Sequence, residues 1–99
     1  MRIRCIGDET LVAALRLAGI TGRAVDNEEA ARDALEDYAI EESVVLVGGG
    51  VYRWVRKTAE RLLSENRDLS IVEIPDLKEG RLEVESDRRI LEKVLGMRL

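Results

Sequence analysis

The chain has 99 residues, enough for one domain, and 36% of them are charged, against about 25% in an average globular protein. Its net charge is −4 with both signs interspersed, which disfavours non-specific binding to nucleic acid or to an anionic membrane. The longest apolar run is far shorter than a membrane span of roughly 20 residues, so we expect a soluble, cytoplasmic protein.

Strand and helix signals alternate along the first half of the chain. Residues 3–6 predict a strand, and Asp8 is placed to cap a helix that Gly19 closes. The predicted apolar face of this helix is Leu11, Leu15 and Ala18. Residues 20–25 predict a short second strand, and residues 26–27 open a second helix. The predicted apolar face of the second helix is Ala31, Ala34, Leu35 and Tyr38.

The second half of the chain continues the same alternation. Residues 44–47 are continuously apolar, as expected for a strand buried on both faces of a parallel sheet. A third helix follows, with Val51, Val55, Thr58, Ala59, Leu62 and Leu63 at helical spacing. Residues 69–74 predict the fourth strand, which ends at Pro75 because proline cannot donate to the ladder.

This alternation predicts an α/β fold. Helical crossovers between strands require parallel pairing with right-handed connections. Four strands then close into a four-stranded parallel Rossmann-like (doubly wound) sheet in the order 2-1-3-4, with a separate C-terminal helix. We expect a body at 1–75, a charged linker at 76–85 and a C-terminal helix at 86–99, with Pro75 and Gly80 as the hinge.

Ligands of such sheets bind at the carboxyl ends of the strands, where the strand order reverses. Gly48, Gly49 and Gly50 follow the third strand there and could let the backbone cradle a phosphate at a helix N-terminus. A dinucleotide fingerprint needs a further glycine where this chain has Arg53, and the lysine of a P-loop is missing. A plain turn, or a close approach of another backbone, is therefore favoured over a small nucleotide- or phosphate-binding site.

Asp8 and Glu9 follow the first strand and could be taken for the acidic pocket of a receiver-like signalling domain. Such domains need an aspartate after the third strand and a lysine after a later one, where this chain has Gly48 and Pro75. We therefore favour a helix-capping role for Asp8. Cys5 lies in a predicted strand of a chain without histidine or a second cysteine, so core packing is its favoured role. We expect no catalytic, cofactor or metal site.

The third helix carries a basic stripe with two aromatic residues beside it. The residues are Tyr52, Arg53, Trp54, Arg56, Lys57 and Arg61. Arginine and aromatic side chains are enriched at interface hot spots, whereas a charged stripe on a helix is usually only a solvated face. Docking of an acidic partner on this stripe is therefore a hypothesis. The negative net charge of the chain makes nucleic acid the less favoured partner.

The last helical stretch has a compact apolar stripe opposite its charged side. The stripe is Ile90, Leu91, Val94 and Leu95. A helix of about 11 residues is marginal alone in water, so it must pack on something. It could pack on its own sheet, or exchange between the sheet and a partner by means of the hinge.

Three motifs in order point to a known family. The chain opens on Ile-Arg-Cys-Ile-Gly-Asp-Glu at residues 3–9 and reaches Leu-Ala-Gly at residues 17–19. Residues 71–75 read Ile-Val-Glu-Ile-Pro, and the chain closes on Val-Leu-Gly-Met-Arg-Leu. Over essentially its whole length the chain resembles the F subunit of the archaeal and vacuolar-type (A/V-type) ATP synthases. It departs from that family at Leu15, often aromatic there, and at the three glycines of residues 48–50, usually a polar turn.

The resemblance implies a Rossmann-like body that binds the coiled-coil subunit of the central rotor shaft. It also implies a C-terminal helix that lies folded or reaches the catalytic A3B3 head and alters ATP hydrolysis. The subunit would have no active site and no cofactor, and would be cytoplasmic, peripheral to the cell membrane within the complex. A small nucleotide- or phosphate-binding domain and a receiver-like signalling domain stay open as alternatives.

Overall fold

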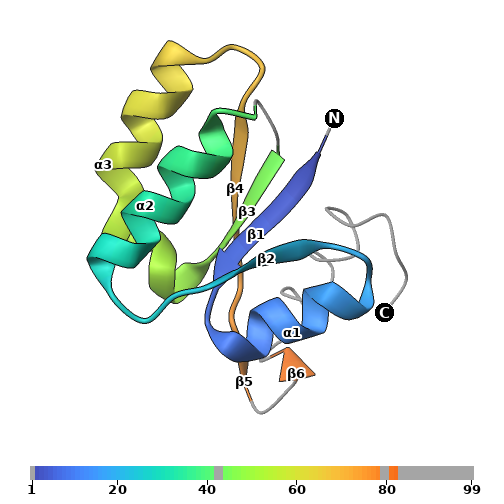
Figure 1. The fold of residues 1–99 in the computed structure, drawn as a ribbon. Coiled ribbons are helices and arrows are strands. Elements are labelled where there is room, and N and C mark those ends of the chain that lie inside the picture. The colour runs from blue at the N-terminus through green and yellow to red at the C-terminus, as the bar shows by residue number, and fades with distance from the viewer. Residues whose placement is uncertain (1, 42–43, 79–80, 83–99) are drawn as a thin grey trace.

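The computed structural model describes residues 2–41, 44–78 and 81–82. Strands and helices alternate through the body (Figure 1), in the order β1 (Ile3–Gly7), α1 (Glu9–Leu17), β2 (Thr21–Ala24), α2 (Glu28–Ala39), β3 (Val44–Gly48), α3 (Gly49–Glu65) and β4 (Ser70–Ile74). Two short strands follow, β5 (Leu77–Lys78) and β6 (Arg81–Leu82).

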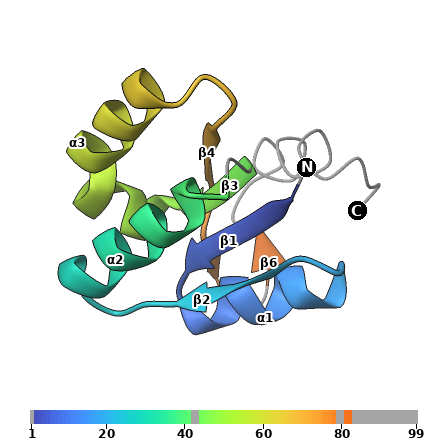
Figure 2. The same ribbon diagram turned by 45° about the horizontal axis from the view of Figure 1, so that its top comes forward.

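The first four strands form one all-parallel sheet in the order β2-β1-β3-β4, and β5 pairs with β6 in a separate antiparallel sheet. The predicted α/β, Rossmann-like fold and its strand order are confirmed. Helix α1 lies on one face of the large sheet, and α2 and α3 lie on the other (Figures 1 and 2). This layering follows from right-handed crossovers that change direction along the sheet at β1.

The larger part of the core lies between the sheet and the pair α2–α3. Alternate strand residues point to this face, and Ile6, Val45 and Val47 are almost completely buried there. The helices contribute small, branched and aromatic side chains, namely Ala31, Ala34, Leu35, Tyr38, Ala39, Val51, Val55, Ala59 and Leu62. All four residues predicted for the apolar face of α2 are buried, which confirms that face.

The second part of the core lies on the α1 side of the sheet. Cys5, Leu46 and Ile74 come from three neighbouring strands, and α1 and its following loop add Leu11, Val12, Leu15 and Ile20. Burial on both faces explains why β3 is continuously apolar in sequence. Within the described residues, no helix is both long enough and apolar enough to cross a membrane.

The local signals at helix ends are confirmed. Asp8 caps α1 by accepting a hydrogen bond from Leu11 N at 2.8 Å, and Asn27 caps α2 by accepting one from Ala30 N at 2.8 Å. Gly19 follows α1 with a φ of 85°, a conformation that glycine adopts without strain.

The structure corrects one residue of a predicted apolar face and adds detail elsewhere. Ala18 is exposed, because α1 has already ended at Leu17 and Ala18 is its C-cap. Leu63 is 40% exposed, at the edge of the buried face of α3. The predicted linker at 76–85 contains the short pair β5–β6. Gly80 and the predicted C-terminal helix at 86–99 lie outside the described residues.

Candidate partner-binding surface

The outward face of α3 carries residues that the sequence singles out for partner binding. Arg53, Arg56 and Lys57 are exposed and have the i, i+3, i+4 spacing that places side chains on one face of a helix. Tyr52 and Trp54 are half-buried and pack against the core between α2–α3 and the sheet. The aromatic residues therefore anchor α3 to the body, whereas the three cations face solvent.

One of these cations rests on an aromatic neighbour. The guanidinium Cζ of Arg56 lies 6.0 Å from the centroid of the Tyr52 ring, at the outer limit of a cation–π contact. At an exposed site such a contact contributes roughly 0.5–1 kcal/mol. This contact keeps the guanidinium group of Arg56 on the outward face of α3.

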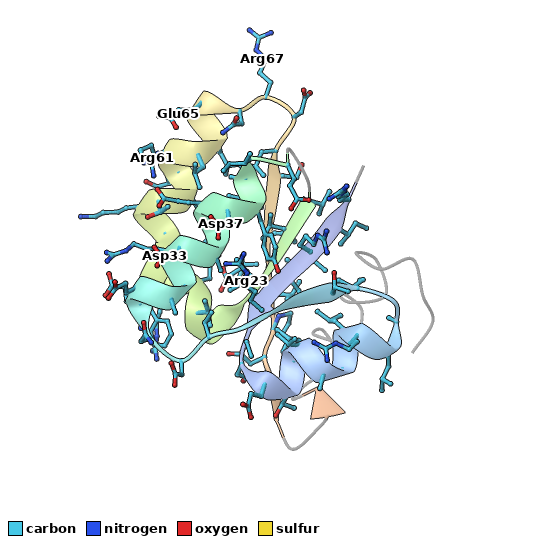
Figure 3. The ribbon with its side chains drawn as sticks, in the orientation of Figure 1. Arg23, Asp33, Asp37, Arg61, Glu65 and Arg67 are labelled. Atoms are coloured by element: carbon cyan, nitrogen blue, oxygen red, sulfur yellow. The ribbon has the colours of Figure 1, made fainter. Side chains whose placement is uncertain are left out.

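Arg61 does not share the environment of the other cations. Its guanidinium lies 2.6 Å from the Glu36 carboxylate on α2 and 3.2 Å from the Glu65 carboxylate one turn further along α3 (Figure 3). The described residues contain no ion pair from Arg53, Arg56 or Lys57. We refer to these three residues as the cationic patch of α3, and Arg61 is a helix-to-helix link outside it.

The carboxyl ends of β1 and β2 border an open pocket with acidic residues in its lining. The lining residues are Asp8, Glu9, Thr10, Ala24, Val25 and Asp26. Because the Asp8 carboxylate accepts the Leu11 N–H, it is engaged in capping α1, as the sequence indicated. Among the described residues, no group of three or more carboxylate, histidine or thiol side chains is arranged to hold a metal ion.

The three glycines after β3 are not a loose turn. Gly48 ends the strand, and Gly49 and Gly50 already form the first turn of α3. Asp76, which follows β4, places its Oδ2 atom 2.7 Å from the backbone N of Gly50 and accepts its hydrogen bond. An internal carboxylate thus occupies the place at the helix N-terminus where a phosphate would accept hydrogen bonds.

Sequence reasoning missed a cluster at the β2 edge of the sheet. The Tyr38 ring on α2 has its centroid 5.1 Å from Cζ of Arg23 and 5.9 Å from Cζ of Arg4. Arg23 also donates to Asp37 Oδ2 at 2.9 Å, and this hydrogen bond raises the pKa of Arg23 above its ordinary value (Figure 3). Arg4 donates to Thr21 across the β1–β2 pair. No local pattern signals this cluster, because it exists only once β1, β2 and α2 are assembled.

Cys5 lies where the sequence placed it, in the core. Its side chain is fully buried, and this burial raises the pKa of the thiol, an effect that the nearby Arg16 only partly offsets. A thiol that is both buried and kept protonated is a poor nucleophile. Core packing is therefore the role that its surroundings support.

The predicted regulatory stripe, Ile90, Leu91, Val94 and Leu95, lies outside the described residues. Of the two predicted hinge residues, Pro75 is half-buried directly after β4. The structure therefore locates where the chain leaves the sheet, at Pro75 and Asp76.

The chain matches the family model described as ATP synthase (F/14-kDa) subunit over residues 3–94. The chain belongs to this family. Its members are the F subunits of the A/V-type ATP synthases, which are non-catalytic rotor subunits of rotary ATPases and take part in ion transport. A comparison with curated proteins gives no match. The matched range includes every described element, so the fold and the cationic patch of α3 both belong to the family region.

Proposed function

We propose that the body, residues 1–75, binds the coiled-coil central-shaft subunit of the ATP synthase through the cationic patch of α3. The patch presents three cations on one helix face without an ion pair among the described residues. Arginine beside aromatic side chains is the composition of interface hot spots, and its charge complements an acidic partner surface. This unpaired patch on α3 is the observation that carries the proposal.

The remainder of the chain has a different role in this proposal. The C-terminal helix at 86–99 reaches the catalytic A3B3 head and regulates ATP hydrolysis, with Ile90, Leu91, Val94 and Leu95 as the contacting stripe. The linker at 76–85 connects it to the body. The subunit would be held at the cytoplasmic side of the cell membrane by the complex. The linker starts directly after the end of β4, and this position supports a division of the chain into body and tail.

Binding to the shaft is tested with the purified full-length chain and the purified shaft subunit. We expect a stable complex in size-exclusion chromatography, with a Kd at least about tenfold weaker for the double variant Arg53→Glu/Lys57→Glu. Arg67→Glu is the control for charge reversal of a cation outside the patch, because Arg67 is also exposed but lies beyond the end of α3. A complex that is weakened equally by both changes, or not by either, would remove the patch from the interface.

Regulation is tested by truncation. The truncation is placed after Leu82, because β5 pairs with β6 and a cut at Gly80 would remove the partner of β5. We expect the truncated chain to melt cooperatively and to join the complex, but the ATP hydrolysis rate of the assembled enzyme to change. An unchanged hydrolysis rate would contradict a regulatory role for the tail.

A further inference from the structure

Helix α3 starts without a cap of its own. Its N-cap is Gly48, which has no side chain to accept a hydrogen bond, and its first turn contains no acidic residue. By contrast, α1 and α2 begin with capping residues Asp8 and Asn27 and carry glutamates in their first turns. A helix of 17 residues therefore presents the positive end of its dipole and its first N–H groups to whatever lies there.

Asp76 supplies the missing cap from a distant part of the chain. Its Oδ2 atom accepts the hydrogen bond of Gly50 N at 2.7 Å, although the two residues are 26 positions apart in sequence. Both residues are partly buried, so solvent screens the interaction less than on an open surface. Asp76 sits between the end of β4 and the start of β5, at the point where the chain leaves the body.

The glycines fit around this carboxylate. A Cβ atom on Gly48 would lie 2.6 Å from Asp76 Oδ1, and one on Gly50 would lie 2.9 Å from Asp76 Oδ2. A Cβ atom on Gly49 would instead meet Glu73 Oε2 at an ordinary 3.5 Å. Side chains at 48 and 50 would therefore displace the carboxylate, whereas one at 49 would not.

We infer that the hydrogen bond between Asp76 and Gly50 is a latch that holds the start of the connector on α3, and that opening it governs how far the tail can move. This inference rests on the proposed regulatory tail. With the latch closed, Asp76 is fixed to the start of α3, and this contact restrains the pair β5–β6 that begins at the next residue. With the latch open, this hydrogen bond no longer ties the start of the connector to α3.

The latch is tested by hydrogen exchange on the full-length chain. Asp76→Ala removes the acceptor, and we expect the amides of Leu77, Lys78 and Leu82 to exchange between about fivefold and thirtyfold faster. Asp8→Ala is the matched control, because it removes a carboxylate cap of the same kind from α1. It should leave the exchange of these three amides unchanged. Equal exchange in Asp76→Ala and the native chain would overturn the latch.

A second pair of variants perturbs the same hydrogen bond at its donor, the start of α3. Gly50→Ala pushes the Asp76 carboxylate aside and should speed exchange of the same connector amides, whereas Gly49→Ala should not. This pair keeps Asp76 in place, so it remains informative if Asp76→Ala folds poorly. Faster exchange in both glycine variants, or in neither, would contradict the proposed contact.

The link to regulation is tested separately in the assembled complex. Asp76→Ala should increase the difference in ATP hydrolysis rate between the full-length chain and the chain truncated after Leu82, and should have no effect in the truncated chain. If truncation changes the ATP hydrolysis rate but Asp76→Ala does not, the proposed coupling between latch and tail is wrong. If truncation itself has no effect, the proposed regulatory function fails, while hydrogen exchange still decides whether the latch exists.

Discussion

Arg61 on α3 and Glu36 on α2 form an ion pair at 2.6 Å that joins the two helices covering one face of the sheet. In sequence Arg61 is the last member of a basic stripe, but in the structure its charge is already neutralised by Glu36 and Glu65. The two arginines at the ends of the stripe therefore have different roles. Arg53 is available to a partner, and Arg61 belongs to the internal organisation of the body.

Substitution of Arg61 by alanine should affect stability slightly and shaft binding not at all. Both partners of the Arg61–Glu36 pair are about half exposed, so the expected loss is only about 0.2–1 kcal/mol in the free energy of unfolding. Urea denaturation measures this loss, and titration with the shaft subunit measures the Kd. A Kd that weakens as much for Arg61→Ala as for Arg53→Ala would mean that the whole stripe is the interface.

Trp54 should contribute to stability and also report partner binding. It is half-buried against the core, so Trp54→Ala should lower the free energy of unfolding by about 1–3 kcal/mol, and Trp54→Phe by less. It is the only tryptophan, so its fluorescence comes from one place, beside the cationic patch of α3. We expect the emission to shift when a shaft subunit that contains no tryptophan binds. Binding without any change in emission would place the interface elsewhere.

Local signals predicted much of this fold. Asp8 and Asn27 cap their helices as expected, because a cap is formed by a side chain and a backbone N–H three residues apart. The continuous apolar character of β3 predicted burial on both faces, and the alternation of strands and helices predicted the parallel order. Each of these features depends on residues that are neighbours in sequence, or on a topology with few alternatives.

The contacts that the sequence did not predict join distant segments. The cap of α3 comes from Asp76, 26 residues after Gly50, so a search for capping residues next to the glycines finds none. The Arg61–Glu36 pair likewise depends on how α2 and α3 lie side by side. The glycines themselves were the available signal. Their number indicated a close approach, and the tightest approaches are made by the Asp76 carboxylate, with Leu11 also near Gly48, whereas backbone atoms lie at ordinary van der Waals distance.

Gly22 on β2 should tolerate no side chain. A Cβ atom there would overlap the carbonyl O and the Sγ of Cys5, which is its register partner on β1. Because the carbonyl belongs to the β1–β2 ladder, it cannot move without breaking that pairing, and Gly22→Ala should cost at least about 2 kcal/mol. Gly19→Ala is the control, since nothing lies within 4 Å of its Cβ position and only its φ of 85° opposes the change. Thermal melting compares the two, and equal melting temperatures would contradict the overlap.

The buried thiol of Cys5 should make stability fall at alkaline pH. Burial raises the pKa of Cys5 in the folded state, so the unfolded chain loses this proton first, from about pH 8.5, while the folded chain keeps it. The unfolded state then binds fewer protons than the folded state. Unfolding therefore becomes more favourable as the pH rises, until the pH passes the raised pKa of the folded state.

Urea denaturation of the native chain and of Cys5→Ala between pH 7 and pH 10 isolates this contribution from the other groups that titrate there. The difference in free energy of unfolding between the two chains should shift against the native chain by up to about 1.4 kcal/mol per pH unit above pH 8.5. Reaction with a thiol reagent at pH 8 should also be slow until denaturant is added, because the side chain is fully buried. A difference that stays constant with pH would mean that the folded thiol titrates like an exposed one, and that the packing around Cys5 on the α1 face is looser than its burial indicates.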